Sequence, residues 1–187
     1  MKSGLSFRKK KVASNIIKLI WTCIFGSIIS IFLGVAIAYG FGLKKMNVGL
    51  SMQPSLVHGQ EVLVNRFHYL MFTPKNNDII VFSPTMSDGN HVYLKRIVAV
   101  PGDSVQIIDG YLFVNGVREK EGFDKMAEAG IAAQPLILNE DEFFALGDNR
   151  NFSEDSRSKK IGIIHRDNII GKAWFSLGKK GAISKFI

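Results

Sequence analysis

The chain has 187 residues, 47% hydrophobic content and a formal net charge of +8, which suits one modest domain with an attached segment. Positions 1–42 hold six basic residues and no acid, so the other 145 residues carry 18 Lys and Arg against 16 Asp and Glu. This near balance disfavours a broad basic face for nucleic acid, and the single cysteine excludes an intrachain disulfide and a Cys-rich zinc site.

An apolar segment follows the basic N-terminus. No charge occurs from Trp21 to Phe41, and a helix of that length is about 30 Å long, enough to cross a bilayer. The basic cluster outweighs Lys44 and Lys45 behind the segment, so the positive-inside rule predicts a cytoplasmic N-terminus. We expect a basic cytoplasmic tail at 1–14, a transmembrane anchor at 15–42 and an extracytoplasmic domain at 43–187, held in the cell membrane by one pass.

A cleavable secretory signal is the alternative for this segment. Ala36-Ile37-Ala38 matches the small-x-small pattern that export proteases cut. However, the apolar stretch reaches back to Ile16 and exceeds the usual core of a signal peptide. The length therefore favours an uncut anchor.

Short apolar runs bounded by Gly, Pro, Asn and Asp predict a mainly β domain beyond the anchor. The expected strands are Val62–Val64, Ile79–Phe82, Val92–Val100, Val105–Ile108, Tyr111–Val114, Phe143–Leu146 and Ile169–Phe175. The predicted fold class is thus mainly β: one N-terminal transmembrane helix followed by a compact antiparallel β domain.

Two dipeptides predict tight hairpin turns in the middle of this domain. Asp109-Gly110 and Asn115-Gly116 flank Tyr111–Val114, and both favour the positive φ angles that such turns require. We therefore expect a meander here. The segment from Phe123 to Ala133 is compatible with a short helix or with an irregular loop.

Three stretches carry residues with chemical potential. The first, Gly49-Leu50-Ser51-Met52-Gln53-Pro54-Ser55-Leu56, sets a serine in a turn-prone context. The second places Lys95 in the apolar run from Tyr93 to Val100, before Pro101-Gly102-Asp103. The third is a polar cluster after an apolar strand, Gly147-Asp148-Asn149-Arg150-Asn151-Phe152-Ser153-Glu154-Asp155-Ser156-Arg157.

Lys95 has two interpretations. It can point to solvent from an otherwise apolar strand. If it is buried, desolvation disfavours the ammonium form and lowers the pKa of Lys95, which gives a neutral amine that can take a proton from a serine.

Together these stretches resemble the type I signal peptidase family. Its blocks read Ser-Met-x-Pro-Thr/Ser-Leu, then Tyr-x-Lys-Arg-x-x-x-x-Pro-Gly-Asp, then Gly-Asp-Asn-Arg-x-x-Ser-x-Asp-Ser-Arg. The similarity extends to Asp78–Phe82 and to Ile169-Ile170-Gly171-Lys172-Ala173, and block order and spacing agree from Gly49 to Ala173.

The resemblance implies a serine endopeptidase with a compact antiparallel β catalytic domain. It would cut exported preproteins after small residues of the Ala-x-Ala type. Ser51 would be the nucleophile, Lys95 the general base and Ser153 the residue that orients the Lys95 amine, a Ser-Lys variant of the nucleophile and base pair. The implied ionic scaffold consists of Arg96, Asp148, Asp155 and Arg157, although each pair is also compatible with an ordinary surface ion pair.

The resemblance also implies an oxyanion hole and substrate pockets. The backbone N–H of Ser51 is the first candidate donor, and Gly49 is the second candidate position. Gly49 occupies the place where many Gram-negative members carry a serine, as it does in many Gram-positive members. The positions that match pocket-lining residues are Met52, Leu56, Tyr93 and Leu94, for which core packing is the alternative.

The remaining expectations concern partners and cofactors. The apolar cluster Phe67, Tyr69, Leu70, Met71 and Phe72 fits either a membrane-surface contact or a buried strand edge. The expected partners are signal peptides of secreted preproteins and the lipid of the cytoplasmic membrane, with the secretion translocon or pilin subunits as further candidates and no nucleic acid. No metal or cofactor is expected, and His58, His68, His91 and His165 are assigned structural or surface roles.

Two other functions fit parts of the pattern. One is a specialised pilin-processing protein, or a non-catalytic pilus-assembly protein built on the same scaffold. The other is a self-cleaving, DNA-binding regulator of the Ser-Lys protease group, which the apolar anchor and the nearly neutral domain disfavour.

Overall fold

The computed structural model describes residues 3–41, 43–84, 91–120, 122–178 and 183–185. The chain divides into two units, one ending at Tyr39 and one beginning at Gly40. The described part of the first unit is helical: it belongs to α1 (Ser3–Phe41), whose last two residues fall in the second unit. The portion of α1 from Asn15 to Gly40 is long and apolar enough to cross a membrane. The hydroxyls of Thr22, Ser27 and Ser30 donate to carbonyls four residues earlier, which satisfies these polar groups within the helix. This portion is a candidate membrane span.

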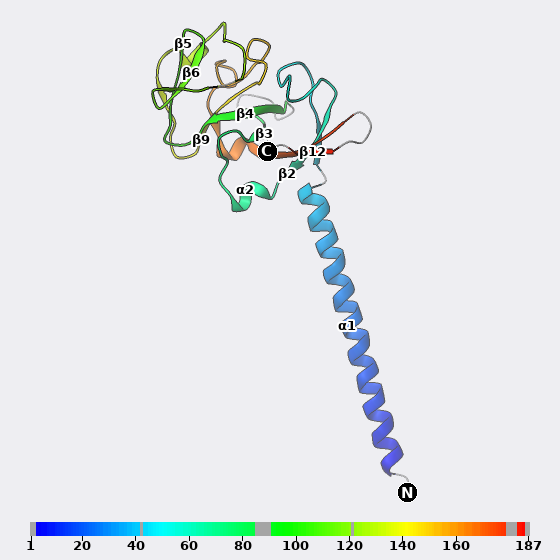
Figure 1. Cartoon of the computed structure of the whole chain (residues 1–187). Coiled ribbons are helices and arrows are strands. Elements are labelled where there is room, and N and C mark those ends of the chain that lie inside the picture. Colours follow the sequence, from blue (N-terminus) through cyan, green and yellow to red (C-terminus); the bar gives the residue numbers. More distant parts are fainter. Residues whose placement is uncertain (1–2, 42, 85–90, 121, 179–182, 186–187) are drawn as a thin grey trace. The chain divides into compact units, whose positions relative to one another are not determined.

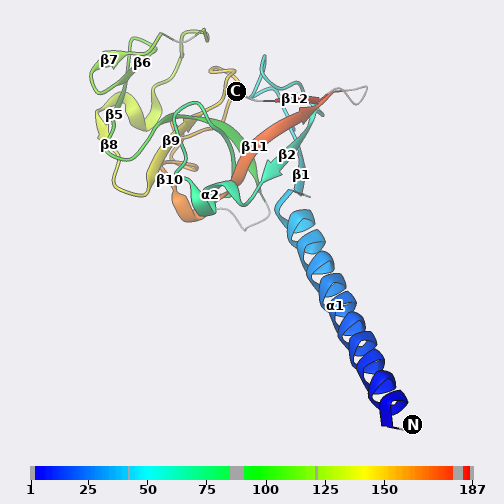
Figure 2. The same ribbon diagram turned by 60° about the horizontal axis from the view of Figure 1, so that its bottom comes forward.

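An antiparallel sheet of eight strands organises the second unit (Figure 1). Its order is β1-β2-β11-β3-β4-β9-β10, and β12 pairs with β11. The strands are β1 (Leu43–Met46), β2 (Glu61–Asn65), β3 (Ile79–Phe82), β4 (Tyr93–Ala99), β9 (Glu142–Leu146), β10 (Ile164–His165), β11 (Ile169–Leu177) and β12 (Ile183–Lys185). Figure 2 shows the long strand β11 beside β2, to which it is hydrogen-bonded. Strand β4 lies between β3 and β9, so both of its edges are paired.

A smaller sheet has the order β7-β6-β5-β8. Its strands are β5 (Ser104–Ile108), β6 (Tyr111–Val114), β7 (Val117–Arg118) and β8 (Leu136–Ile137). Asp109 and Gly110 have φ angles of 50° and 80°, and Asn115 and Gly116 have φ angles of 53° and 75°. These are the positive angles that two-residue hairpin turns need, so the predicted meander is confirmed.

Helical elements in the second unit are short. They are α2 (His68–Met71) and the 3₁₀ turns η1 (Gly130–Ala133) and η2 (Arg166–Asn168). Of the segment from Phe123 to Ala133, only η1 is helical, so the irregular-loop alternative holds for its larger part.

The main sheet is covered on both faces. Ile79 and Val81 of β3 pack in one buried cluster with Met52 and Leu56. Their neighbours Ile80 and Phe82 pack in a second cluster, which includes Tyr69, Ile97 and Phe143. Since successive strand residues point to opposite faces, a strand buried on both sides reads as a continuous apolar run.

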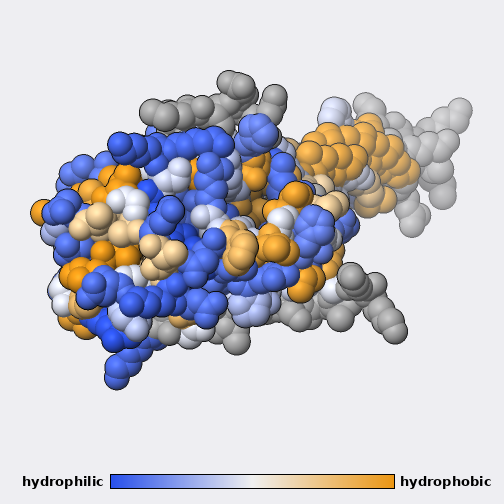
Figure 3. Space-filling model, turned by 90° about the horizontal axis from the view of Figure 1, so that it is seen from above, coloured by the Kyte–Doolittle hydropathy of each residue, from blue (hydrophilic) through white to orange (hydrophobic). Residues whose placement is uncertain are grey.

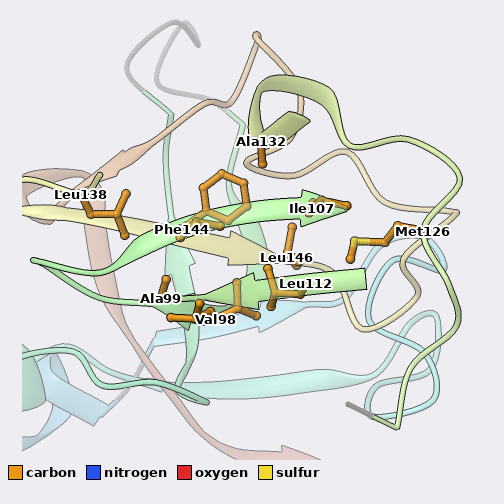
Figure 4. Packing of buried hydrophobic residues seen from close by; sticks show 11 residues of the cluster. Val98, Ala99, Ile107, Leu112, Met126, Ala132, Leu138, Phe144 and Leu146 are labelled. Carbon is orange, nitrogen blue, oxygen red and sulfur yellow. The ribbon is translucent and has the colours of Figure 1, made fainter. Parts of the chain in front are cut away.

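A third cluster joins the two sheets (Figure 4). Val98 and Ala99 from β4 and Phe144 and Leu146 from β9 face Ile107 and Leu112 of the small sheet, with Met126, Ala132 and Leu138 at the margin. Figure 3 shows a face of the molecule on which hydrophilic side chains predominate and apolar ones form separate patches. The predicted fold class, mainly antiparallel β after an N-terminal apolar helix, is confirmed.

The seven predicted strands correspond to β2, β3, β4, β5, β6, β9 and β11, with ends that differ by two residues or fewer. Strands β1, β7, β8, β10 and β12 were not predicted. Four of them have only two or three residues, too few to display a period, and the sequence of β1, Leu-Lys-Lys-Met, does not alternate between apolar and polar residues.

The cluster between the sheets allows a matched test of core packing. Phe144→Ala should lower the free energy of unfolding by about 3–5 kcal/mol, because Phe144 is completely buried and its removal leaves a cavity. Phe152→Ala is the control, since that ring is 69% exposed and its loss should change stability by less than about 0.5 kcal/mol. Urea unfolding of the full chain in detergent micelles measures both, and equal losses would contradict the assigned core.

Candidate active site

Ser51 lies in the loop that connects β1 to β2. Within this loop the Gln53 N–H donates to the Leu50 carbonyl at 3.1 Å, and the Leu56 N–H donates to the Met52 carbonyl at 2.8 Å. Met52 and Leu56 are completely buried in the core cluster beneath, so they fasten the loop to the sheet. Ser51 itself, directly before Met52, stays partly exposed.

Lys95 lies on β4, opposite Ile80 of β3, and only 3% of it is exposed. Its Nζ is 2.9 Å from Ser51 Oγ. As an ammonium, Lys95 donates to the serine oxygen; as a neutral amine, its lone pair can accept the serine proton. Of the two interpretations that the sequence left open for this lysine, the structure selects burial.

Burial is the largest influence on the ionisation of Lys95. It lowers the pKa of Lys95 from 10.5 to about 8, because the ammonium loses hydration. The negative charges of Asp155, Glu154 and Asp148 act in the opposite direction, and the positive charge of Arg157 acts with burial. At pH 8 about half of the molecules would then carry the neutral amine, against about three in a thousand for an unperturbed lysine.

Arg96, next to Lys95 on β4, forms the first buried ion pair of the site. Its Nε and Nη2 donate to the two carboxylate oxygens of Asp148 at 2.8 and 2.7 Å, and no part of the Asp148 side chain is exposed. The same guanidinium donates to Ser55 Oγ at 3.2 Å and to the Asn77 carbonyl at 3.1 Å. Arg96 therefore ties the segment after β9 to the loop that carries Ser51.

Asp155 and Arg157 form the second ion pair. Arg157 Nε and Nη2 donate to the Asp155 carboxylate at 2.8 and 2.9 Å. The Gly147 N–H donates to Asp155 Oδ2 at 3.1 Å, and Arg157 also donates to the carbonyls of Glu128 and Arg150. This pair folds the segment from Gly147 to Arg157 back on itself.

Ser153 lies close to the loop that carries Ser51 but forms no hydrogen bond with Lys95. A Cβ placed at Gly147 would lie 2.2 Å from Ser153 Oγ and 2.5 Å from the Ser51 carbonyl oxygen, so glycine lets the two serines approach. Ser153 Oγ is buried and has no hydrogen-bond partner in the described part of the chain. The expected bond from Ser153 to the lysine amine is therefore absent from this conformation.

The two candidate oxyanion donors differ in what they already bind. The Ser51 N–H has no acceptor among the described residues, whereas the Ser51 carbonyl accepts from the Asn149 N–H at 3.0 Å. The Gly49 N–H donates to His58 Nδ1 at 2.9 Å. Ser51 thus has a free donor, and Gly49 does not offer one in this conformation.

The four expected pocket residues are mostly core residues. Met52 and Leu56 have no exposed surface and Leu94 is 7% exposed, all within one cluster. A completely buried side chain cannot line an open pocket in this conformation, so core packing, the alternative interpretation, describes Met52 and Leu56. Tyr93 is partly exposed, and its hydroxyl donates to Glu154 Oε2 at 3.4 Å.

Three contacts at the site had no counterpart in the sequence interpretation. Ser55 links the loop that carries Ser51 to Arg96, and Asn149 links the same loop to the segment after β9. His58, assigned a structural or surface role, binds the backbone two residues before Ser51. Ser55 and Asn149 lie inside the recognised motifs, whereas no sequence signal distinguishes His58.

Metal-ligating side chains do not cluster in the part of the chain that the structure describes. Over those residues, no group of three or more His, Cys, Asp or Glu side chains is arranged to hold a metal ion.

Comparisons with known proteins agree on one family. A family model described as signal peptidase, peptidase S26, matches residues 20–177. Signal peptidase I P of Bacillus subtilis subsp. natto is 32% identical over 136 residues, which cover 68% of this chain and 72% of that protein. Probable signal peptidase I-2 of Synechocystis is 30% identical over 128 residues, covering 66% of this chain but only 57% of that protein. A crystal structure of a signal peptidase I from Enterococcus faecalis aligns with 54% of this chain and 97% of its own, at 29% identity and a TM-score of 0.45.

The pair Arg96 and Asp148 can be tested by a double-mutant cycle. Arg96→Ala should lower the free energy of unfolding by about 3–5 kcal/mol, because it leaves the Asp148 carboxylate buried without its cation. The double variant Arg96→Ala with Asp148→Ala should cost clearly less than the sum of the two single variants. Urea unfolding of the four proteins gives the coupling energy.

Lys160→Ala is the control for this cycle. It breaks the exposed pair of Lys160 with Glu154 and should leave stability nearly unchanged. Additive effects of Arg96→Ala and Asp148→Ala would show that the buried pair does not act as a unit.

Proposed function

Because the chain belongs to the signal peptidase S26 family, whose model covers residues 20–177, we propose that it is a membrane-bound serine endopeptidase that removes signal peptides from exported preproteins. The resemblance to type I signal peptidases seen in the sequence is thereby confirmed. The observation that carries the proposed activity is the buried amine of Lys95 at 2.9 Å from Ser51 Oγ. A serine and a desolvated lysine at this distance form a nucleophile and its base.

The mechanism follows from this geometry. The neutral Lys95 amine accepts the proton of Ser51, and Ser51 Oγ attacks the carbonyl carbon of the scissile bond. The Ser51 N–H stabilises the oxyanion that forms. Lys95 then gives its proton to the leaving amine, and an ester of Ser51 with the signal peptide remains. Lys95 next accepts a proton from water, which attacks the ester. Lys95 then returns this proton to Ser51 Oγ as the ester bond breaks, and the signal peptide leaves with a new carboxyl end.

The supporting residues act through position. Arg96 with Asp148, and Asp155 with Arg157, hold the segment after β9 against the loop of Ser51. Ser153 would orient the Lys95 amine, which requires a change from the side-chain conformation in which its Oγ is unpaired. Cleavage after small residues of the Ala-x-Ala type remains the expected specificity.

The proposed topology uses α1 as an uncut anchor. Its apolar portion Asn15–Gly40 would span the membrane, with the basic tail 1–14 in the cytoplasm and the domain 43–187 outside. Leu70 and Met71 of α2 and Phe72 directly after it are 76%, 80% and 53% exposed, an arrangement that suits a lipid surface. Tyr69 anchors α2 from beneath, because its hydroxyl donates to the buried carboxylate of Asp78 at 2.9 Å.

Other functions have less support. A pilin-specific or non-catalytic assembly role is not favoured, since the matching relatives are signal peptidases and Ser51 and Lys95 are in contact. The secretion translocon and pilin subunits stay candidate partners only.

The first functional test removes the nucleophile and the base. Ser51→Ala and Lys95→Ala should each abolish cleavage of a model preprotein by the full chain in detergent micelles, and the double variant should be no worse than either single one. Ser104→Ala, in the small sheet, is the matched control and should cleave as the wild type does. Cleavage retained by Ser51→Ala would end the serine-protease proposal.

The second functional test is the pH dependence of cleavage. Because the neutral amine is the active form and the pKa of Lys95 is lowered to about 8, kcat/KM should rise with pH and level off above about pH 8. If Ser153 orients the amine, Ser153→Ala should lower kcat more than it raises KM. The pH at which kcat/KM levels off should stay the same.

The pH–rate profiles are measured where circular dichroism shows the fold intact. A wild-type activity that instead follows an ionisation near 10.5 would contradict a buried lysine base.

A further inference from the structure

The loop that carries Ser51 closes on itself through its own polar groups. The Asn47 N–H donates to the Gln60 carbonyl and the Gly59 N–H donates to the Asn47 carbonyl, both at 2.8 Å. The buried Asn47 side chain donates to the carbonyls of Leu56 and Val57 at 3.2 and 3.1 Å. These bonds fix the two ends of the loop and its second half.

The first half of the loop has fewer restraints. Gly49 has a φ angle of 96°, a conformation that glycine adopts without the cost that a side chain would add. Its N–H donates to His58 Nδ1 at 2.9 Å, across the loop. Among the described residues, this is the only side-chain bond from the second half of the loop to the segment Gly49–Ser51.

The bond requires one form of the imidazole. An acceptor Nδ1 must be without a proton, so His58 must be neutral with its proton on Nε2, and a protonated imidazole cannot accept. Lys44 of β1 and Glu61 of β2 pair with each other at 3.8 Å. His58 forms no ion pair in the described structure, and it is exposed to solvent.

We propose that His58 is a positioning residue for the nucleophile, which fixes the Gly49 peptide and through it the direction of Ser51. The proposal rests on the proposed peptidase function and deepens it. His58 acts through the backbone and touches neither Ser51 Oγ nor Lys95 Nζ. A neutral His58 holds Ser51 in line with Lys95, and protonation of His58 releases the first half of the loop.

If the bond between Gly49 and His58 had the contrary role, removal of the imidazole would change activity in the opposite direction. If Gly49 were an oxyanion donor, His58 would withhold its N–H from the substrate, and removal of the imidazole would raise activity. Positioning predicts that removal lowers activity. The direction of the effect therefore decides between the two.

The test compares two substitutions of His58 in the full chain. His58→Ala removes the acceptor and should lower kcat for a model preprotein about two- to tenfold, the range that one hydrogen bond supports, with KM little changed. His58→Asn should restore most of kcat, because Asn Oδ1 branches from Cγ as His Nδ1 does and can accept the same bond. His165→Ala is the control, since that exposed histidine faces Asp141 on another loop.

Rescue by His58→Asn separates positioning from general stabilisation, because the asparagine restores the acceptor without the imidazole. Unchanged or raised activity of His58→Ala would overturn the proposal.

A measurement without catalysis keeps this inference distinct from the proposed function. Nitrogen NMR of histidine-labelled protein in micelles should show His58 with a bare Nδ1, and hydrogen exchange at the Gly49 amide should be faster in His58→Ala. A wild type that cleaves no preprotein would refute the peptidase proposal even if both signals are seen. A protonated Nδ1 at high pH, or unaltered Gly49 exchange, would refute the role of His58 by itself.

Discussion

Burial of one lysine beside one serine is the constraint on which the site depends. An ammonium in the interior is costly, and the three acids around Lys95 would favour it if their charges were unopposed. Arg96 neutralises Asp148 and Arg157 neutralises Asp155, each through two hydrogen bonds. These ion pairs hold two carboxylates close to Lys95, and the positive charge of Arg157 acts with burial to lower the pKa of Lys95 against them.

The sheet supplies the burial. Strand β4 is paired on both edges, by β3 and β9, and the side chains on either side of it belong to three core clusters. This central strand holds Lys95 at 3% exposure while its amine still reaches a loop. Lys95 and Arg96, adjacent on this strand, contact Ser51 and Ser55 of the same loop. One strand thus positions both Lys95 and the guanidinium of Arg96 against the loop that carries Ser51.

The sequence predicts the fold where apolar runs are long and turns are chemically specific. The run Ile79–Phe82 and the turns at Asp109-Gly110 and Asn115-Gly116 agree with the structure, whereas two-residue strands such as β7 and β8 carry no period to detect. At the site, the motifs locate Ser51 and Lys95. They do not separate a pocket from a core at Met52 and Leu56, because an apolar side chain satisfies either environment. Likewise, the motif that includes Ser153 contains no information on its side-chain conformation.

The contacts that the sequence could not predict have a common physical origin. They are single hydrogen bonds in which at least one partner is a loop residue: Asn149 to the Ser51 carbonyl, Arg96 to Ser55, and Gly49 to His58. Loops lack the regular repeat that makes helices and strands readable, so these pairings appear only once the chain is folded. Yet Ser51 lies on such a loop and Lys95 on a strand that is paired on both edges. The distance between Ser51 Oγ and Lys95 Nζ therefore depends on what restrains the loop. The buried side chains of Met52 and Leu56 hold the loop against the sheet, and the hydrogen bonds restrain the orientation of its backbone around Ser51. For that reason residues outside the motifs can control the alignment of Ser51 with Lys95 without contacting either side chain.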